Sequence, residues 1–69
     1  MRKPVPSHKL TGRFQGAAGR YHESGNEAVA AACLRAADAY MTAALCPGAK
    51  FRATADKLAK EAVRLGAEI

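Results

Sequence analysis

Nearly half of the residues between Glu27 and Leu45 in this 69-residue chain are alanine. The segment reads "EAVAAACLRAADAYMTAAL", and its only charged side chains are Glu27, Arg35 and Asp38. Alanine has the highest helix propensity, so the run predicts a long helix. Its small side chain cannot fill a core alone, but it lets helix axes approach to the short end of the usual spacing, about 8 to 10 Å. The segment therefore indicates a closely packed helical protein.

Turn and cap residues divide the chain into an arm and three helices. Two prolines in "MRKPVP" favour an extended basic arm. Ser7 can cap a first helix, and Gly25 suits the left-handed end of that helix. The second helix begins either with a capping box of Ser24 and Glu27 or with Asn26 as its cap. The prediction is one helical domain over 1–69, with an arm over 1–6 and helices over about 8–23, 26–46 and 48–67.

The central helix is apolar on nearly all sides, whereas the third helix has a single apolar face. A helix that is apolar on nearly all sides is expected to be buried. If the second and third helices form a hairpin, the alanine side of the second helix stays uncovered. An identical hairpin from another copy of the chain, related by a two-fold axis, would cover that side. We therefore expect an all-α fold: a helical hairpin with a shorter N-terminal helix on its outside, dimerising into a helix bundle. The side chains assigned to the core or the dimer interface are Val29, Cys33, Leu34, Met41, Leu45, Phe51, Leu58 and Leu65.

A chain this short needs a further source of stability, because a monomer would bury only about 60% of the surface of its unfolded chain. Cys33 and Cys46 would lie about 20 Å apart along one helix, too far for a disulfide. The histidines and cysteines have no CxxC or HxxxH spacing, so we expect no metal site and no cofactor, and thiols that are buried or half-buried. Oligomerisation is the remaining source of stability, and we predict a homodimer.

All of the net charge of +5 lies in the first third of the chain, since residues 1–22 hold five basic side chains and no acidic one. This asymmetry favours contact with nucleic acid or an acidic protein face, or else a solvated arm. The N-terminus has no apolar stretch typical of a signal peptide. Arg35 and Asp38 at the centre of the alanine run argue against a membrane span. We expect a cytoplasmic protein.

Catalytic chemistry finds no support in the sequence. The glycines of "GRFQGAAG" do not have the spacing of a phosphate-binding loop, and no serine or cysteine is placed to form a triad with His22 and Glu23. We therefore expect a non-enzyme. Lys9, Arg13 and Arg20 could form a basic strip, which leaves a small nucleic-acid-binding protein as one alternative. The helix order also resembles tetratricopeptide and microtubule-interacting-and-transport modules, which makes a helical adaptor the other.

The opening "MRKPVPSHKLTGRF", the alanine-rich segment and the closing amphipathic helix together resemble the phage-encoded quorum-sensing anti-activator proteins. The likeness spans all 69 residues. It implies a non-enzymatic helical dimer in the host cytoplasm that binds a LuxR-type transcription regulator and blocks its DNA binding. The resemblance also implies the type IV pilus assembly ATPase as a second host target. No functional residue of that family maps onto this chain by motif.

A small basic protein without catalytic groups is expected to act by occupying the surface of a partner. Tyrosine and arginine are enriched in binding hot spots. Tyr40 is ambiguous, because its place in the apolar sector also fits a dimer core. The predicted partner contacts are Arg13, Arg20 and Tyr21 on the first helix, and Arg35, Asp38 and Tyr40 on the second.

Overall fold

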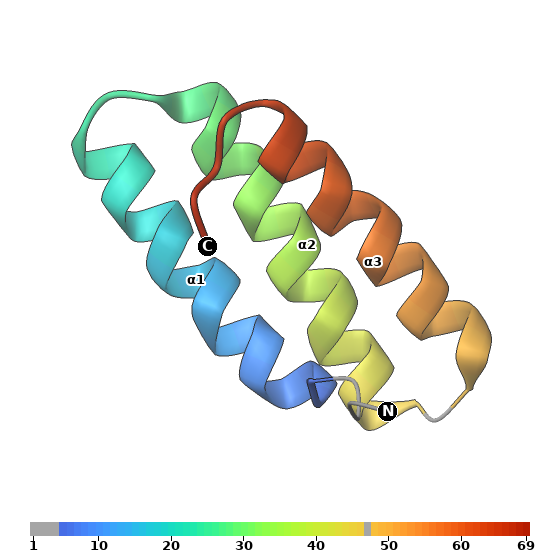
Figure 1. The fold of residues 1–69 in the computed structure, drawn as a ribbon. Coiled ribbons are helices and arrows are strands. Elements are labelled where there is room, and N and C mark those ends of the chain that lie inside the picture. Colours follow the sequence, from blue (N-terminus) through green and yellow to red (C-terminus); the bar gives the residue numbers. More distant parts are fainter. Residues whose placement is uncertain (1–4, 47) are drawn as a thin grey trace.

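The computed structural model describes residues 5–46 and 48–69, which form three helices and no strand. The helices are α1 (Ser7–Glu23), α2 (Glu27–Leu45) and α3 (Ala49–Arg64) (Figure 1). The prediction of an all-α chain with three helices is confirmed. Residues 1–4, which make up most of the predicted arm, and Pro47 lie outside the described part.

The first helix starts one residue earlier than predicted, with Pro6 and not Ser7 as its N-cap. The carbonyl of Pro6 accepts backbone hydrogen bonds from Lys9 and Leu10 at 3.1 and 3.2 Å. The Ser7 side chain makes no cap and instead accepts a hydrogen bond from Arg52. The predicted Ser7 cap was therefore wrong, because its hydroxyl is used in a contact between helices.

The turn between α1 and α2 follows one of the two predicted alternatives. Gly25 has φ of +84°, in the left-handed region that favours glycine. Asn26 caps α2 by accepting from the backbone N–H of Val29 at 3.4 Å. The hydroxyl of Ser24 donates back to the carbonyl of Tyr21, so it takes no part in a capping box.

Helix α3 ends at Arg64, three residues before the predicted boundary. Gly66 has φ of +116°, and the N–H of Ala67 donates to the carbonyl of Ala62. This is the bond of a Schellman end, which turns the chain out of the helix. The residues beyond it run back toward α1, where Ala67 is buried (Figure 1).

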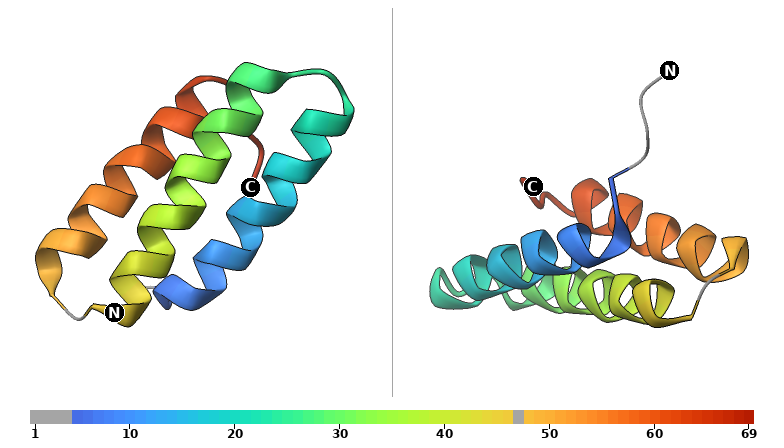
Figure 2. Two further views of the ribbon diagram at one scale, coloured as in Figure 1. Left: turned by 180° about the vertical axis from the view of Figure 1, so that it is seen from behind. Right: turned by 90° about the horizontal axis from the view of Figure 1, so that it is seen from below.

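Helix α2 lies at the centre, and both other helices pack against it. Figure 2 shows α1 and α3 on the same side of α2, so within the described residues no helix lies on the opposite side of α2. The first helix was predicted on the outside of a hairpin, and this was wrong. Its Phe14, Ala17 and Ala18 are buried in the core, because the small side chains of α2 leave room for a second neighbouring helix.

Alanine forms most of the core that the structure describes. Ala36 and Ala37 are fully buried at 0% exposure, as are Ala55 and Ala62 of α3. The hydroxyl of Thr11 on α1 lies 3.4 Å from the backbone carbonyl oxygen of Ala37 on α2. The Thr11 side chain therefore reaches the backbone of α2. The predicted close approach of helices is thus present, but within one copy of the chain.

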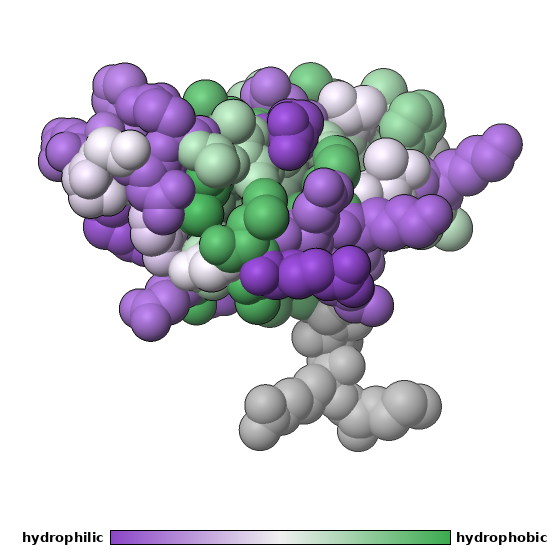
Figure 3. All heavy atoms as spheres, turned by 90° about the horizontal axis from the view of Figure 1, so that it is seen from above, coloured by the Kyte–Doolittle hydropathy of each residue, from purple (hydrophilic) through white to green (hydrophobic). Residues whose placement is uncertain are grey.

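Several large apolar side chains lie outside this alanine-rich core. Of the eight residues assigned to the core or dimer interface, only Val29 and Cys33 are buried, and Leu58 is half-buried. Figure 3 shows hydrophobic residues at the surface among hydrophilic ones. A role in the monomer core was therefore wrong for the remaining five, whereas their role in a dimer stays a prediction. The exposed five are Leu34, Met41, Leu45, Phe51 and Leu65.

Candidate protein-binding surfaces

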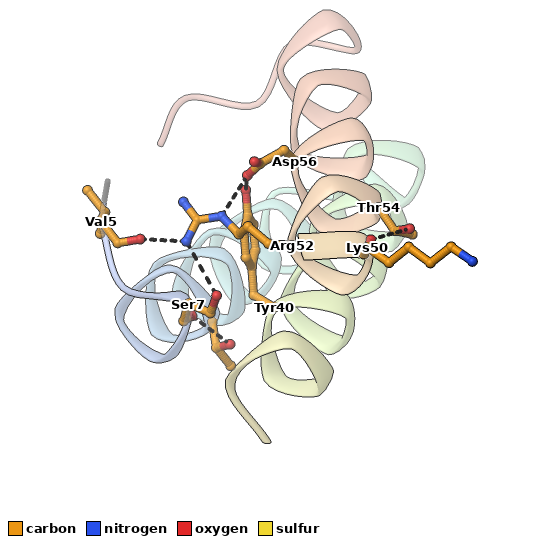
Figure 4. A network of polar contacts seen from close by, with 8 residues as sticks. Val5, Ser7, Tyr40, Lys50, Arg52, Thr54 and Asp56 are labelled. Carbon is orange, nitrogen blue, oxygen red and sulfur yellow. Dashed lines mark hydrogen bonds and ion pairs between the residues drawn. The ribbon is translucent and has the colours of Figure 1, made fainter. Parts of the chain in front are cut away.

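A polar network joins α2, α3 and the start of α1 (Figure 4). The hydroxyl of Tyr40 donates to Oδ1 of Asp56 at 2.6 Å, and Nε of Arg52 donates to the same oxygen at 3.0 Å. The guanidinium of Arg52 lies over the Tyr40 ring, 5.3 Å from its centroid. It also donates to the Val5 carbonyl at 2.7 Å and to Ser7 Oγ at 3.3 Å. Arg52 thereby ties α3 to the chain that enters α1.

The network shifts the pKa values of its two acidic groups in opposite directions. Burial raises the pKa of Tyr40 well above its ordinary value, and its hydrogen bond to Asp56 adds to the effect. Burial also raises the pKa of Asp56, but hydrogen bonds from Tyr40 and Arg52 outweigh it, so this pKa lies below its ordinary value. At neutral pH the network therefore holds a neutral phenol against a carboxylate.

Tyr40 has a structural role and is not an exposed contact. It is 3% exposed and stacks on Phe14 with ring centroids 5.6 Å apart. The prediction that it contacts a partner is corrected on this ground, since neither the ring nor the hydroxyl reaches the surface of the folded chain. Sequence reasoning missed Arg52 and Asp56. Their i,i+4 spacing was the available signal, and the structure pairs them as a salt bridge.

Tyr21 and Arg20 hold the C-terminal segment against α1. The Tyr21 hydroxyl donates to the carbonyl of Gly66 at 3.2 Å and accepts from the N–H of Glu68 at 2.8 Å. Nη2 of Arg20 donates to the carbonyl of Glu68 at 3.3 Å. Tyr21 is half-buried, whereas Arg20 is exposed. Arg20 therefore contacts the C-terminal segment and still presents part of its side chain to solvent.

The other predicted contact residues lie on open surface. Arg13 on α1 is exposed, as are Arg35 and Asp38 on α2. Within the described residues, salt bridges join His22 to Glu27 and Arg52 to Asp56, so none of these three side chains is paired. They remain available to a partner.

Three exposed side chains form a row along the side of α2 that carries no helix. Leu34, Met41 and Leu45 are 51%, 43% and 76% exposed, and their spacing of seven and four residues places them on one face. We refer to them as the α2 row. Beside the row lies a shallow groove between α1 and α2, here called the α1–α2 groove. Its lining residues are Gln15, Ala18, Gly19, His22, Glu27, Ala30, Ala31 and Leu34.

A second row runs along α3 at a spacing of seven residues. Phe51 and Leu65 are 44% and 49% exposed, with half-buried Leu58 between them. We call these three residues the α3 row. A hollow beside it has Leu58 and Leu65 as its apolar part, and its rim carries more cations than acids. The other lining residues are Thr54, Lys57, Lys60, Glu61 and Arg64.

The two cysteines differ in exposure, and both are free. Cys33 is fully buried, and this burial raises the pKa of its thiol. Cys46 is exposed, so the prediction of a buried or half-buried thiol was wrong for it, because α2 ends at Leu45. In the described part of the chain, no three His, Cys, Asp or Glu side chains are grouped to hold a metal ion.

By length and composition alone, α2 could cross a membrane, a test that the core helix of a soluble protein also passes. Arg35 and Asp38 are exposed near its centre. Comparison of the chain with protein-family models, with curated proteins and with solved structures finds no match in any of the three.

Proposed function

We propose that this protein is a non-enzymatic inhibitor that acts by covering a surface of another protein. The observation that carries the proposal is the distribution of the apolar side chains in the described chain. Alanine forms most of the core, whereas Leu34, Met41, Leu45, Phe51 and Leu65 are exposed. Exposed apolar patches of this kind are typical of interaction sites. Covering the exposed half of a leucine or phenylalanine would contribute about 1 kcal/mol to binding.

The α3 row is the surface that we assign to the target. It combines apolar side chains with a charged rim, which is the usual anatomy of a protein interface. The polar rim of Lys57, Lys60, Glu61 and Arg64 can orient a partner while Leu58 and Leu65 provide apolar contact. Arg13 and Arg20 on α1, with Arg35 and Asp38 on α2, are further exposed contacts that a larger target could reach.

The resemblance to phage anti-activators supplies the candidate target. We propose that the chain binds a host LuxR-type transcription regulator in the cytoplasm and prevents it from binding DNA. The type IV pilus assembly ATPase is the second candidate target. Bulk coverage is sufficient for such inhibition, because a regulator whose DNA-binding helix is covered cannot enter the major groove.

The test is a mobility-shift assay of a purified LuxR-type regulator on its DNA site, with this protein added in increasing amounts. The wild-type protein should displace the regulator from its DNA, and a Phe51→Ser/Leu65→Ser variant should lose most of this activity. Val63→Ser is the matched control, since Val63 is a 54% exposed apolar side chain of α3 outside the α3 row. Equal release by all three proteins would contradict the assignment of the α3 row, and no release by wild type would contradict the proposed target.

Nucleic-acid binding is a second candidate, because Lys9, Arg13 and Arg20 are all exposed along α1. Phosphate contacts of this kind give binding that weakens steeply as salt rises. A nonspecific duplex should then shift at about 50 mM salt and be released at several times that concentration. Absence of a shift at the low salt concentration would remove this candidate.

A further inference from the structure

The α2 row lies on a side of the molecule that no other helix of the described residues covers. Figure 2, seen from behind, shows α2 in front of α1 and α3 on this side. Leu45 is 76% exposed, the highest value among the large apolar side chains of the described chain. Ala32, on the alanine side of α2 that was expected to face a second copy, is already buried within one copy of the chain. A partner on this side would have to match the α2 row instead.

The α2 row and the α1–α2 groove are arranged symmetrically about one point of α2. Leu34 and Met41 lie 3.5 residues, about 5 Å, on either side of the midpoint between Ala37 and Asp38. Leu45 lies about 11 Å beyond this midpoint, and Ala30 in the groove lies about 11 Å before it. A large exposed side chain at one end of α2 is thus matched by a small-residue groove at the other end.

A second copy of α2, antiparallel to the first and related by a two-fold axis at this midpoint, would bring matching surfaces together. Leu45 would lie over Ala30 in the partner's groove, and Leu34 would meet the partner's Met41. Large side chains opposite small ones are what closely packed helix layers require. Because the axis is two-fold, each of these contacts occurs twice.

Charge supports the same arrangement. Arg35 and Asp38 are exposed on the same flank of the α2 row and take part in no salt bridge within the described residues. In the antiparallel pair Arg35 would lie two residues, about 3 Å along the helix, from the partner's Asp38. An arginine side chain spans this offset easily, and the symmetry produces two such pairs of opposite charge.

We propose that two copies of this chain associate through antiparallel α2 helices, with the α2 row of each copy against the α1–α2 groove of the other. The occupant is a second copy because the same helix carries both the projecting side chain and its complement at equal distances from one point. The α3 row belongs to another helix, so the apolar contacts with the proposed target and with the second copy use different side chains.

Sedimentation equilibrium with charge exchange tests the pairing. Wild type should form a dimer, and Arg35→Glu or Asp38→Lys alone should weaken it by about tenfold, because like charges then face one another. The double variant Arg35→Glu/Asp38→Lys should return to within about threefold of wild type, since each pair is restored with exchanged signs. Circular dichroism at matched concentration shows that each variant keeps its helices.

Leu45→Ala with Val63→Ala as its control tests the apolar part. Both positions are exposed on helices, but only Leu45 belongs to the α2 row, so only its truncation should weaken association. Wild type that stays monomeric to about 500 µM would overturn the proposal, because even weak specific dimers form at such concentrations. A double charge variant no tighter than the single variants, or equal effects of the two alanine variants, would also overturn it. Phe51→Ser/Leu65→Ser should still dimerise, so failure of the dimer and failure of target binding are separate results.

Discussion

Replacing Tyr40 with phenylalanine tests the role of the network between α2 and α3. The change removes one hydroxyl and keeps the ring that stacks on Phe14. It deletes the 2.6 Å hydrogen bond to Asp56 but leaves the Arg52–Asp56 salt bridge in place. We expect a loss of stability without a loss of fold.

The size of the loss follows from the exposure of the carboxylate. A hydrogen bond to a charged group contributes about 1.5–3 kcal/mol when the acceptor would otherwise be left unpaired. The Asp56 side chain is 47% exposed, so water can replace the lost donor. We therefore expect Tyr40→Phe to lower the free energy of unfolding by about 1–1.5 kcal/mol, or the melting temperature by about 4–12 °C. Tyr40→Ala should cost about 3–5 kcal/mol, because it also removes the buried ring.

The assay is urea unfolding followed by circular dichroism, at one low protein concentration and at several pH values. The pKa of Asp56 is lowered in the folded state, so its contribution is complete above the ordinary aspartate pKa of about 3.9 and is lost as pH falls through the lower folded-state pKa. Tyr40→Phe removes one cause of that lowering. The difference in the free energy of unfolding between wild type and variant should therefore become smaller as the pH falls below about 4.

Two results would refute this reasoning. A gap that stays constant from neutral pH to well below pH 4 would show that the Asp56 charge is not involved. A loss of about 3 kcal/mol or more for Tyr40→Phe would show that the hydroxyl does more than its hydrogen bond accounts for.

Three further predictions follow from the core, the glycines and the thiols. Ala36→Leu should cost about 1–3 kcal/mol in chemical unfolding, because Ala36 is fully buried where α2 meets its neighbours; an unchanged or raised stability would contradict the close helix approach. Gly19→Ala should raise the melting temperature, since nothing lies within 4 Å of the added methyl group, whereas Gly25→Ala should lower it, because φ there is +84°; the same sign for both changes would be inconsistent with the two backbone conformations. A thiol reagent should label exposed Cys46 rapidly and Cys33 only as the chain unfolds, as mass spectrometry of timed samples can show; equal labelling rates would argue against the buried position of Cys33.

The fold class and the turns could be predicted because local residues determine them. The alanine-rich run over 27–45 and the glycine at position 25 required no long-range information. The position of α1 could not be predicted in the same way. Alanines on several sides of α2 allow neighbours on more than one side, and periodicity alone does not say whether these neighbours come from the same chain or from another copy.

The candidate surfaces were only partly predictable for a related reason. Exposed charge at Arg13, Arg35 and Asp38 follows from their places on the helical wheel. Burial of the large apolar residues was inferred from their hydrophobicity, but two helices on the same side of α2 leave Leu34, Met41 and Leu45 outside. The burial of Tyr40 depends on Phe14, Arg52 and Asp56, which come together only in the folded chain.

The central claim is that the fold depends on its alanine core while the α2 row serves association. The most direct measurement is the free energy of unfolding of Leu34→Ala/Met41→Ala/Leu45→Ala against wild type, at a dilute and at a high protein concentration. In the dilute sample the variant should lie within about 2 kcal/mol of wild type, because these side chains are largely exposed and alanine favours the helix. At high concentration the gap should widen, because only wild type gains stability from dimerisation. A loss of about 6 kcal/mol or more in the dilute sample, as for three buried side chains, would contradict the account.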